Sequence, residues 1–331
     1  MLQTIDVGID VALASLTVVV LDPAGQPGPP FEVPNTAAGC RRLRRRLERL
    51  ELPVRACLEP TSTYHLRLAR ELFASARVTV CLVNPRAVRD FARGAMGRGK
   101  TDAADALVLA RYGRALEPRA WQPPGPVERE LRAISRRIDD LTGRRTALKN
   151  RLHSLAAAEP PGVVVADLQS ELRGLATRLR KLRAAACALI RTQPQLERRY
   201  QLLLSMTGIG AVSAIRLLAE LGGLPAELGK KQWVAAAGLD PVPRESGKSL
   251  NGPRRISKQG NARLRMGLNV PALVAARYCP PVRAYYQRLQ DRGLAKLAAL
   301  CAVMRKLLQA IWGMFHSDQP FNPELLCQSP R

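Results

Sequence analysis

The sequence predicts a chain of three parts: a mixed α/β domain, a long helical arm and a mainly α-helical domain. Residues 1–115 alternate between β-rich apolar runs and amphipathic helical patterns, which suits a mixed α/β sheet. After a proline-rich break at 121–126, leucine and isoleucine follow three-four spacing over two long segments. From Tyr200 onwards the apolar residues fall into shorter helical segments. These patterns predict domains at 1–120, 121–195 and 196–317, followed by a tail at 318–331.

The first domain is predicted to open with a β-hairpin and to continue with alternating helices and strands. The predicted strands are Thr4–Asp10, Leu16–Leu21, Val54–Leu58 and Val78–Val83. The predicted helices are Ala37–Leu50, His65–Ala74 and Asp102–Arg114. Thr101 is the expected N-cap of the last helix.

The arm is predicted to be a coiled-coil hairpin or a dimerisation arm. Its two apolar series are Leu131, Ile134, Ile138, Leu141, Leu148, Leu152 and Leu155, and then Leu168, Leu172, Leu175, Leu179, Leu182 and Leu189. The segment Glu159-Pro160-Pro161-Gly162 separates them, because no helix continues through it. We expect deletion of Leu131–Leu189 to impair assembly more than folding.

The last domain is predicted to contain a helix-hairpin-helix-like element. Gly208-Ile209-Gly210 separates the apolar segments Leu202–Leu204 and Ala214–Leu221. Backbone N–H groups at such a helix N-terminus bind phosphate, although a plain tight turn would show the same pattern. Further helices are expected at Ala262–Ala276 and Ala295–Trp312, and the proline-rich segment after His316 is expected to be poorly ordered.

The charge of the chain predicts a nucleic-acid partner. Lys+Arg number 52 against 27 Asp+Glu, giving a net charge of +25. An acidic membrane is the rival partner, but aromatic residues make up only 4% of the chain and no run of 18 apolar residues exists. The seven cysteines form no C-x-x-C pair, which indicates a reducing compartment and predicts a cytoplasmic, nucleoid-associated protein.

Four carboxylates predict a metal site. Asp10 and Glu59 close two predicted strands, and Asp102 and Asp105 lie three residues apart on a predicted helix. Carboxylates that converge from separate elements are the ligands that Mg²⁺ prefers, and two such ions about 4 Å apart activate attack on a phosphodiester. Taken singly, each acid is also compatible with a turn or a helix cap. Asp6 is a poorer candidate because it lies in the middle of its strand.

A second candidate site is the basic segment at 238–265, predicted to be a loop until about Asn261. Three serines, Ser246, Ser249 and Ser257, lie among basic residues. Such a loop binds phosphates, and a hydroxyl among cations is also a candidate nucleophile. Composition alone does not choose among the three serines.

The ordered motifs resemble a known family. These are Gly8-Ile9-Asp10, Glu59-Pro60-Thr61-Ser62-Thr63-Tyr64, Asn84-Pro85, Lys100-Thr101-Asp102-Ala103-Ala104-Asp105, Gly208-Ile209-Gly210, Gly238-Leu239-Asp240-Pro241 and Ser257-Lys258-Gln259-Gly260-Asn261. They resemble the DEDD-type transposases of bacterial insertion sequences, the IS110 family, whose relatives include the Piv-type DNA invertases. The family has a serine in its C-terminal domain that corresponds to Ser246. The residues that lead to it here, Pro243-Arg244-Glu245, form a more compact segment than the family pattern.

The resemblance implies a RuvC-like ribonuclease H fold for the first domain and Mg²⁺ (or Mn²⁺) on Asp10, Glu59, Asp102 and Asp105. It implies Ser246 as the nucleophile in a composite site between subunits. It also implies donor and target DNA, a structured guide (bridge) RNA and a homo-oligomer, dimer or tetramer, with no membrane partner. The expected nucleic-acid-binding residues are Lys100, Thr101, Gly208, Gly210, Arg244, Lys248, Arg254, Arg255, Lys258, Asn261 and Arg265.

Two other functions remain open from the sequence. A RuvC-like hydrolytic endonuclease or junction resolvase would use only the acidic site and would keep cleavage without Ser246. A non-catalytic basic protein would bind nucleic acid without metal and would cut no strand at any concentration of divalent ion.

Overall fold

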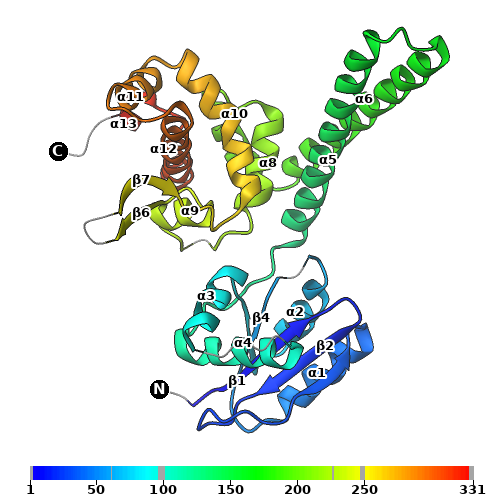
Figure 1. Ribbon diagram of the computed structural model, residues 1–331, viewed down its shortest axis with the longest axis vertical. Coiled ribbons are helices and arrows are strands. Elements are labelled where there is room, and N and C mark those ends of the chain that lie inside the picture. The colour runs from blue at the N-terminus through cyan, green and yellow to red at the C-terminus, as the bar shows by residue number, and fades with distance from the viewer. Residues whose placement is uncertain (1–2, 61, 96–100, 226, 247–249, 328–331) are drawn as a thin grey trace. The chain divides into compact units, whose positions relative to one another are not determined.

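The computed structural model describes residues 3–60, 62–95, 101–225, 227–246 and 250–327. It forms two compact units, Met1–Pro123 and Pro124–Arg331 (Figure 1).

The first unit contains a five-stranded mixed sheet with the strand order β3-β2-β1-β4-β5. β1 and β2 form the predicted antiparallel hairpin, β3 continues it, and β4 and β5 run parallel to β1. The strands are β1 (Ile5–Val11), β2 (Ser15–Val20), β3 (Phe31–Pro34), β4 (Val54–Leu58) and β5 (Val78–Leu82). The helices are α1 (Ala37–Glu48), α2 (His65–Phe73), α3 (Pro85–Ala95) and α4 (Asp102–Leu116). All seven predicted elements are present, and β3 and α3 are additional to them.

Alternation along β1 sends its two sets of side chains to opposite faces of the sheet. Ile5, Val7 and Ile9 join the core formed with α1 and α2. Gly8 lies on the other face, where α4 crosses β1 (Figure 1). A Cβ atom on Gly8 would overlap the carbonyl oxygen of Ala106, so only glycine allows α4 to approach this closely. Asp10 has the same parity as Gly8 and therefore belongs to the face that α4 covers.

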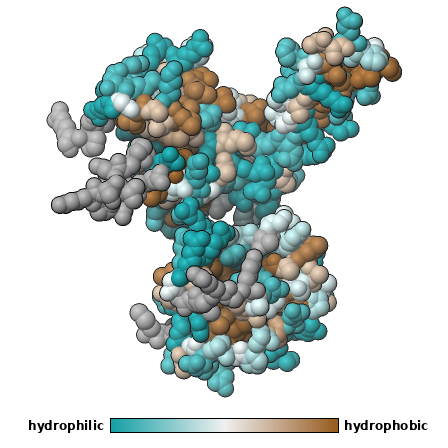
Figure 2. All heavy atoms as spheres, in the orientation of Figure 1, coloured by the Kyte–Doolittle hydropathy of each residue, from teal (hydrophilic) through white to brown (hydrophobic). Residues whose placement is uncertain are grey.

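The second unit begins with two long antiparallel helices that contact each other, α5 (Pro126–Ala156) and α6 (Gly162–Arg191). At their far end Val163 is 76% exposed and Val164 38% exposed. Hydrophobic surface is visible there in Figure 2. The other end of this pair is part of the core of the unit, because Leu131, Ile138 and Leu141 are buried with residues of the remaining helices. The deletion of Leu131–Leu189 considered above would therefore remove core residues.

The rest of the second unit packs around α12, whose residues Val303, Leu307 and Ile311 are fully buried. Its elements are α7 (Pro194–Leu204), α8 (Ala211–Leu221), α9 (Lys230–Ala236), β6 (Pro241–Ser246), β7 (Leu250–Ile256), α10 (Ala262–Tyr278), α11 (Pro280–Asp291), α12 (Lys296–Ser317) and α13 (Pro323–Cys327). By length and composition α12 is one described helix that would suit a membrane span, but 44% of its apolar window is buried in this core. One such helix is weak evidence for a membrane span, and the buried residues of α12 take part in the core of this unit.

Two expectations for this unit are wrong. The basic segment is not a loop throughout, because β6 and β7 form an antiparallel hairpin. Its period-2 signal is weak because Val242 and Arg255 are exposed and a register shift occurs between Val242 and Arg244. The expected poorly ordered tail is also wrong for 318–327, where Leu326 is buried and the backbone N–H of Phe321 donates to Ser205 Oγ over 2.9 Å.

Candidate active site

The carboxyl ends of β1 and β4 bring Asp10 and Glu59 to the same edge of the sheet. The two strands are parallel neighbours, and Ile9 pairs with Leu58. Asp10 and Glu59 each follow their paired residue by one position, so they are adjacent across the strands and share the face that α4 covers. Both side chains are half-buried. Strand register therefore places two of the predicted carboxylates side by side.

The first turn of α4 supplies the other two carboxylates. Thr101 is the N-cap, as predicted, and its hydroxyl accepts a hydrogen bond of 3.1 Å from the N–H of Ala104. Asp102 is exposed, whereas Asp105 is half-buried. The close approach of α4 to Gly8 occurs at Ala106, directly after Asp105. The contact that requires glycine at position 8 therefore also directs Asp105 towards the strand end that carries Asp10.

The charges at this edge interact. Burial raises the pKa of Glu59, and the negative charges of Asp10 and Asp105 raise it further, while Arg89 opposes the shift. Three carboxylates thus share one electrostatic environment, in which a cation would relieve their repulsion. Asp102 is not among the groups that shift Glu59.

The donor set at this edge consists of carboxylate oxygens, which suit Mg²⁺ or Mn²⁺. Within the described part of the chain, however, no three His, Cys, Asp or Glu side chains are grouped closely enough to form a finished metal-binding cluster. Mutual repulsion of like charges keeps carboxylates apart without a cation. The chemistry of the residues therefore fits a divalent metal, and binding requires the side chains to converge further.

Asp6, the weaker candidate in the sequence, has a structural partner. It is 3% exposed, and Arg55 of β4 donates to its Oδ1 over 3.1 Å. Arg55 also donates to the carbonyl oxygen of Gly113 in α4 over 2.9 Å. Burial raises the pKa of Asp6, while the charges of Arg55 and Arg114 lower it. Asp6 therefore helps to hold α4 against the sheet.

The second candidate site is the β6–β7 hairpin, whose strand β6 ends at Ser246, paired with Leu250. The side chains of Arg244, Ser246 and Arg254 lie outside the described part of the structure, as do Lys100, Lys248 and Ser249. The hairpin base is well defined, since the N–H groups of Ser257 and Lys258 donate to the carbonyls of Asp240 and Gly238 over 2.9 and 3.1 Å. Ser257 Oγ also donates to Asp240 Oδ1 over 2.5 Å. Ser257, one of the three candidate serines, therefore closes the hairpin base.

Two residues expected to bind nucleic acid are also engaged within this base. The Asn261 side chain caps α10 by accepting from the N–H of Arg263 over 2.9 Å, and its amide donates to Glu220 over 2.7 Å. Arg265 donates to the carbonyl oxygen of Ala237 over 2.8 Å. These bonds bring distant segments together, and direct nucleic-acid contacts of Asn261 and Arg265 stay a prediction. Arg255 and Lys258 are exposed and remain candidates.

The two glycines of the predicted helix-hairpin-helix turn differ. Gly208 has a φ of +95°, and a Cβ there would lie 2.7 Å from the carbonyl oxygen of Pro271 in α10. Packing against α10 therefore explains Gly208. Gly210 is the N-cap of α8 and has open space around its Cα. Only Gly210 leaves a helix N-terminus accessible to a phosphate.

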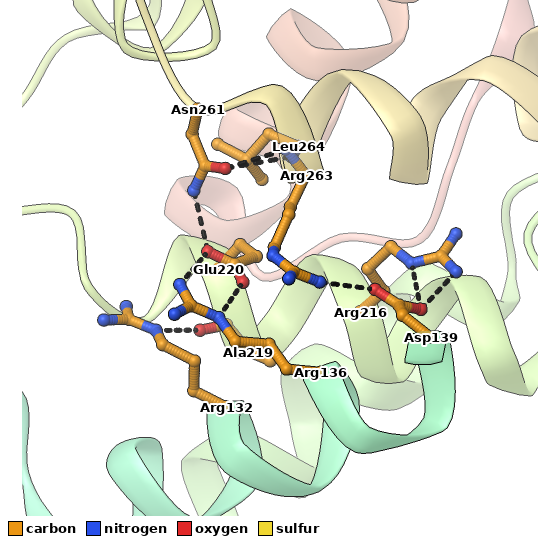
Figure 3. A network of polar contacts seen from close by, with 9 residues as sticks. All are labelled: Arg132, Arg136, Asp139, Arg216, Ala219, Glu220, Asn261, Arg263 and Leu264. Carbon is orange, nitrogen blue, oxygen red and sulfur yellow. Dashed lines mark hydrogen bonds and ion pairs between the residues drawn. The ribbon is translucent and has the colours of Figure 1, made fainter. Parts of the chain in front are cut away.

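A polar network beneath the hairpin links α5, α8 and the start of α10 (Figure 3). Glu220 of α8 is 3% exposed and accepts from Arg136 of α5 over 3.2 Å as well as from Asn261. Burial favours a higher pKa for Glu220, but the hydrogen bonds from Asn261 and Arg136 and the charges of Arg136 and Arg132 lower it overall. Arg132 donates to the carbonyl oxygen of Ala219 over 3.1 Å.

A second carboxylate completes this network. Asp139 of α5 accepts from Arg216 of α8 and from Arg263 of α10, the latter over 3.3 Å. Sequence patterns do not single out Asp139, Arg216 or Arg263 as site residues. The available signal was the two charges Arg216 and Glu220 inside the apolar run Ala214–Leu221, because a charge that is buried there requires a partner. Their partners are far away in sequence and could not be named from them.

Comparison with known proteins identifies the family. A DEDD transposase model of the IS110 type, described as "Transposase", matches residues 7–158. A second model, "Transposase IS116/IS110/IS902 family", matches residues 200–287. The first implies a ribonuclease H-like α/β fold, with which the mixed sheet agrees at this coarse level.

Relatives cover most of the chain. The pilin gene-inverting protein of Moraxella bovis is 29% identical over 270 residues, 81% of this chain and 82% of the relative. The insertion element IS900 42 kDa protein of Mycobacterium paratuberculosis is 30% identical over 194 residues, 57% of this chain and 47% of the relative. The insertion element IS116 44.8 kDa protein of Streptomyces clavuligerus is 26% identical over 312 residues, 74% of this chain and 78% of the relative.

Transposases of this kind act on DNA, and a DEDD carboxylate set implies a divalent metal ion. The first matched region contains the motifs of the acidic site, and the second contains those of the β6–β7 hairpin. The chain is a DNA transposase of an insertion sequence and belongs to the IS110 family of DEDD transposases.

Proposed function

We propose that this transposase cuts and exchanges DNA strands through a composite site, in which Ser246 is the nucleophile and Asp10, Glu59, Asp102 and Asp105 hold Mg²⁺ or Mn²⁺. The observation that carries the acidic half is the shared charge environment of Glu59, Asp10 and Asp105 at one sheet edge. The serine half is supported by the anchored base of the β6–β7 hairpin, whose strand β6 ends at Ser246.

In the proposed reaction, Ser246 Oγ attacks the scissile phosphorus and releases its proton to water. A serine–phosphorus bond forms, one phosphorus–oxygen bond of the DNA backbone breaks, and the leaving oxygen takes up a proton. A bound divalent ion would supply charge stabilisation for the phosphodiester. Asp10, Glu59, Asp102 and Asp105 would hold that ion at the sheet edge, and the exposed Arg255 and Lys258 would stabilise negative charge near the hairpin.

We further propose that the serine of one subunit meets the acidic site of another in a homo-oligomer. Ser246 and the four carboxylates lie in different compact units, as expected if one subunit supplies the serine and another supplies the carboxylates. The net charge of +25 supports binding of two polyanions, DNA and a structured RNA encoded by the element. The proposed nucleic-acid contacts are Lys100, Thr101, Gly208, Gly210, Arg244, Lys248, Arg254, Arg255, Lys258, Asn261 and Arg265.

The test is a cleavage assay on element-end DNA with its flanking noncoding RNA and Mg²⁺. Reactions are stopped with denaturant and probed for DNA covalently attached to protein. We expect an adduct with the wild type and with Ser170→Ala, a control at an exposed serine of α6. We expect no adduct with Ser246→Ala or Asp10→Ala.

The outcomes separate the competing functions. Cleavage that continues in Ser246→Ala without any adduct would identify a hydrolytic endonuclease or resolvase. In that case the hairpin would be a phosphate-binding surface only. Binding without cleavage at every Mg²⁺ or Mn²⁺ concentration would identify a non-catalytic protein.

A further inference from the structure

Helix α1 carries a surface of four exposed arginines. Its buried side is formed by Cys40, Leu43 and Leu47. Arg41, Arg42, Arg45 and the C-cap residue Arg49 are exposed. At 100° per residue these four positions fall within an arc of about 100°, and at ~1.5 Å per residue they span about 12 Å along the helix. They form one continuous face, named here the arginine face.

Other arginines of α1 are already engaged, whereas the arginine face is not. Arg44 pairs with Glu71 at 3.0 Å and with Glu48 at 3.6 Å. Arg46 lies over the ring of Phe31, 3.5 Å from its centre. Among the described residues, the four arginines of the face have no carboxylate within ion-pair distance. Four like charges on one helix face repel one another and favour a polyanionic partner.

Hydrogen bonds attach the start of α1 to the loops of the acidic site. Asn35, directly before the N-cap Thr36, is buried. Its amide donates to the carbonyl oxygens of Ala12 over 2.9 Å and of Tyr64 over 3.4 Å. Ala12 follows Asp10, and Tyr64 follows Glu59, in the loops that leave the carboxyl edge of the sheet. The arginine face is thereby held in a defined position relative to the carboxylates.

We infer that the arginine face binds the phosphate backbone of duplex DNA flanking the cleavage point. DNA is favoured because the face is attached to the site that acts on DNA, and a duplex extends beyond that site on both sides. A membrane is disfavoured because the apolar residues of α1 are buried rather than exposed beside the arginines. The inference requires DNA as substrate, and it is independent of the roles proposed for Ser246 and the metal.

The experiment measures affinity for element-end duplex DNA between about 50 and 200 mM salt, without divalent metal, by fluorescence anisotropy. The test variant replaces Arg41, Arg42, Arg45 and Arg49 by Gln, which has a helix propensity similar to Arg. A second variant replaces them by Lys, which keeps the charge. The matched control replaces Arg173, Arg178, Arg180 and Lys181, all exposed on α6, by Gln and removes the same net charge.

We expect the Gln variant to bind at least about tenfold more weakly and the slope of log affinity against log salt to fall by about 3.6, since each of four phosphate contacts contributes ~0.9. The Lys variant should stay close to the wild type, and the α6 control should change the slope by less than about 1. Thermal unfolding verifies that α1 is intact.

Three results would overturn the inference. The first is an unchanged slope in a folded Gln variant, and the second is an equal loss in the α6 control, which would indicate only the overall charge. The third is loss of affinity for the noncoding RNA with unchanged affinity for DNA, which would assign the face to RNA. None of these results would affect the adduct assay, so failure of this inference is distinguishable from failure of the serine mechanism.

Discussion

The ionisation of Glu59 affects both the acidic site and the stability of the first unit. Its carboxylate is half-buried beside two like charges, so its ionised form costs free energy in the folded state. Asp6 shows the contrasting case, a buried carboxylate paired with Arg55. Glu59 lies beside two like charges, and Arg89 only partly offsets them, which favours a functional role over a stabilising one.

We expect Glu59→Gln to abolish cleavage and to raise the Tm of the first unit by about 2 °C, consistent with removal of an unfavourable charge. Because the folded-state pKa of Glu59 is raised above its unfolded value of about 4.3, the wild type loses stability as pH rises through the folded-state pKa. The advantage of the variant should therefore be present at pH 7 and vanish below about pH 4.

Calorimetry across this pH range, with and without Mg²⁺, measures both effects. Mg²⁺ should raise the Tm of the wild type more than that of Glu59→Gln, because the ion relieves the same repulsion. Glu51→Gln, at an exposed acid of the same unit, is the control and should leave the Tm and its Mg²⁺ response unchanged. A variant that is less stable than the wild type at pH 7 would contradict the unfavourable charge.

Asp102→Asn tests the exposed member of the set. We expect it to abolish cleavage while leaving DNA affinity equal or higher, because a negative charge facing phosphate is removed. The helix should persist, since its cap is Thr101 and the first-turn charge contributes only about 0.3–1 kcal/mol. Gel cleavage and anisotropy assays measure the two properties, with Asp167→Asn on α6 as control. A large loss of binding would remove Asp102 from the proposed metal ligands.

Among the elements, the β6–β7 hairpin depends on contacts at its base. Gly260 illustrates this, because a Cβ there would overlap the carbonyl oxygen of Ala236. Asn261 directly follows Gly260, and its amide donates a hydrogen bond to Glu220. The hairpin base is therefore linked to the Glu220 network (Figure 3). The orientation of the hairpin therefore rests on helices α5 and α8 as well as on its own strands.

We expect Glu220→Gln to destabilise the second unit by roughly 1–3 kcal/mol at pH 7 and to reduce the yield of the serine–DNA adduct. Because the folded-state pKa of Glu220 is lowered, its stabilising contribution is present above the unfolded pKa and is lost as pH falls through the folded-state value. The difference between wild type and variant should therefore shrink below about pH 4.

Urea unfolding at pH 7 and at about pH 3 measures the difference. The matched control is Asp318→Asn, which breaks the exposed Arg198–Asp318 pair and should cost less than about 1 kcal/mol. Equal destabilisation by the two variants would show that the buried network contributes no more to the free energy of unfolding than an exposed ion pair does.

For the whole molecule, the arm combines two roles that the sequence could not separate. Its base supplies Leu131, Arg136 and Asp139 to the core and network of the second unit. Val163 and Val164 are exposed at its far end. An exposed apolar end on a long helical pair is a candidate contact between subunits.

We expect that replacing only residues 149–170 by a short Gly-Ser linker lowers the oligomeric state while the fold is retained. Light scattering after size-exclusion chromatography and thermal unfolding measure the two properties. An unchanged oligomer would locate the subunit contact elsewhere, and loss of folding would show that the far end also supports the core.

Much of the local structure follows from the sequence pattern, because side-chain period, caps and breaking residues act within a few positions. The strand Val54–Leu58, the N-cap Thr101 and the helix that begins at Asp102 agree with the prediction, and the family follows from short ordered motifs. The hairpin β6–β7 was not predicted, because Val242 and Arg255 at its described ends are both exposed and give no alternation of buried and exposed positions.

Only the tertiary structure shows which residues distant in sequence interact with one another. Asn261 and Arg265 match a basic motif that predicts nucleic-acid contacts, and helix packing also brings Glu220 and the Ala237 carbonyl close enough to form hydrogen bonds with them. The sequence likewise identified Asp10, Glu59 and Asp105 as acids at element ends, but their common charge environment arises from strand register and from the approach of α4 to Gly8. Hydrogen bonds and Coulomb energies depend on distances in space, and chain folding sets those distances.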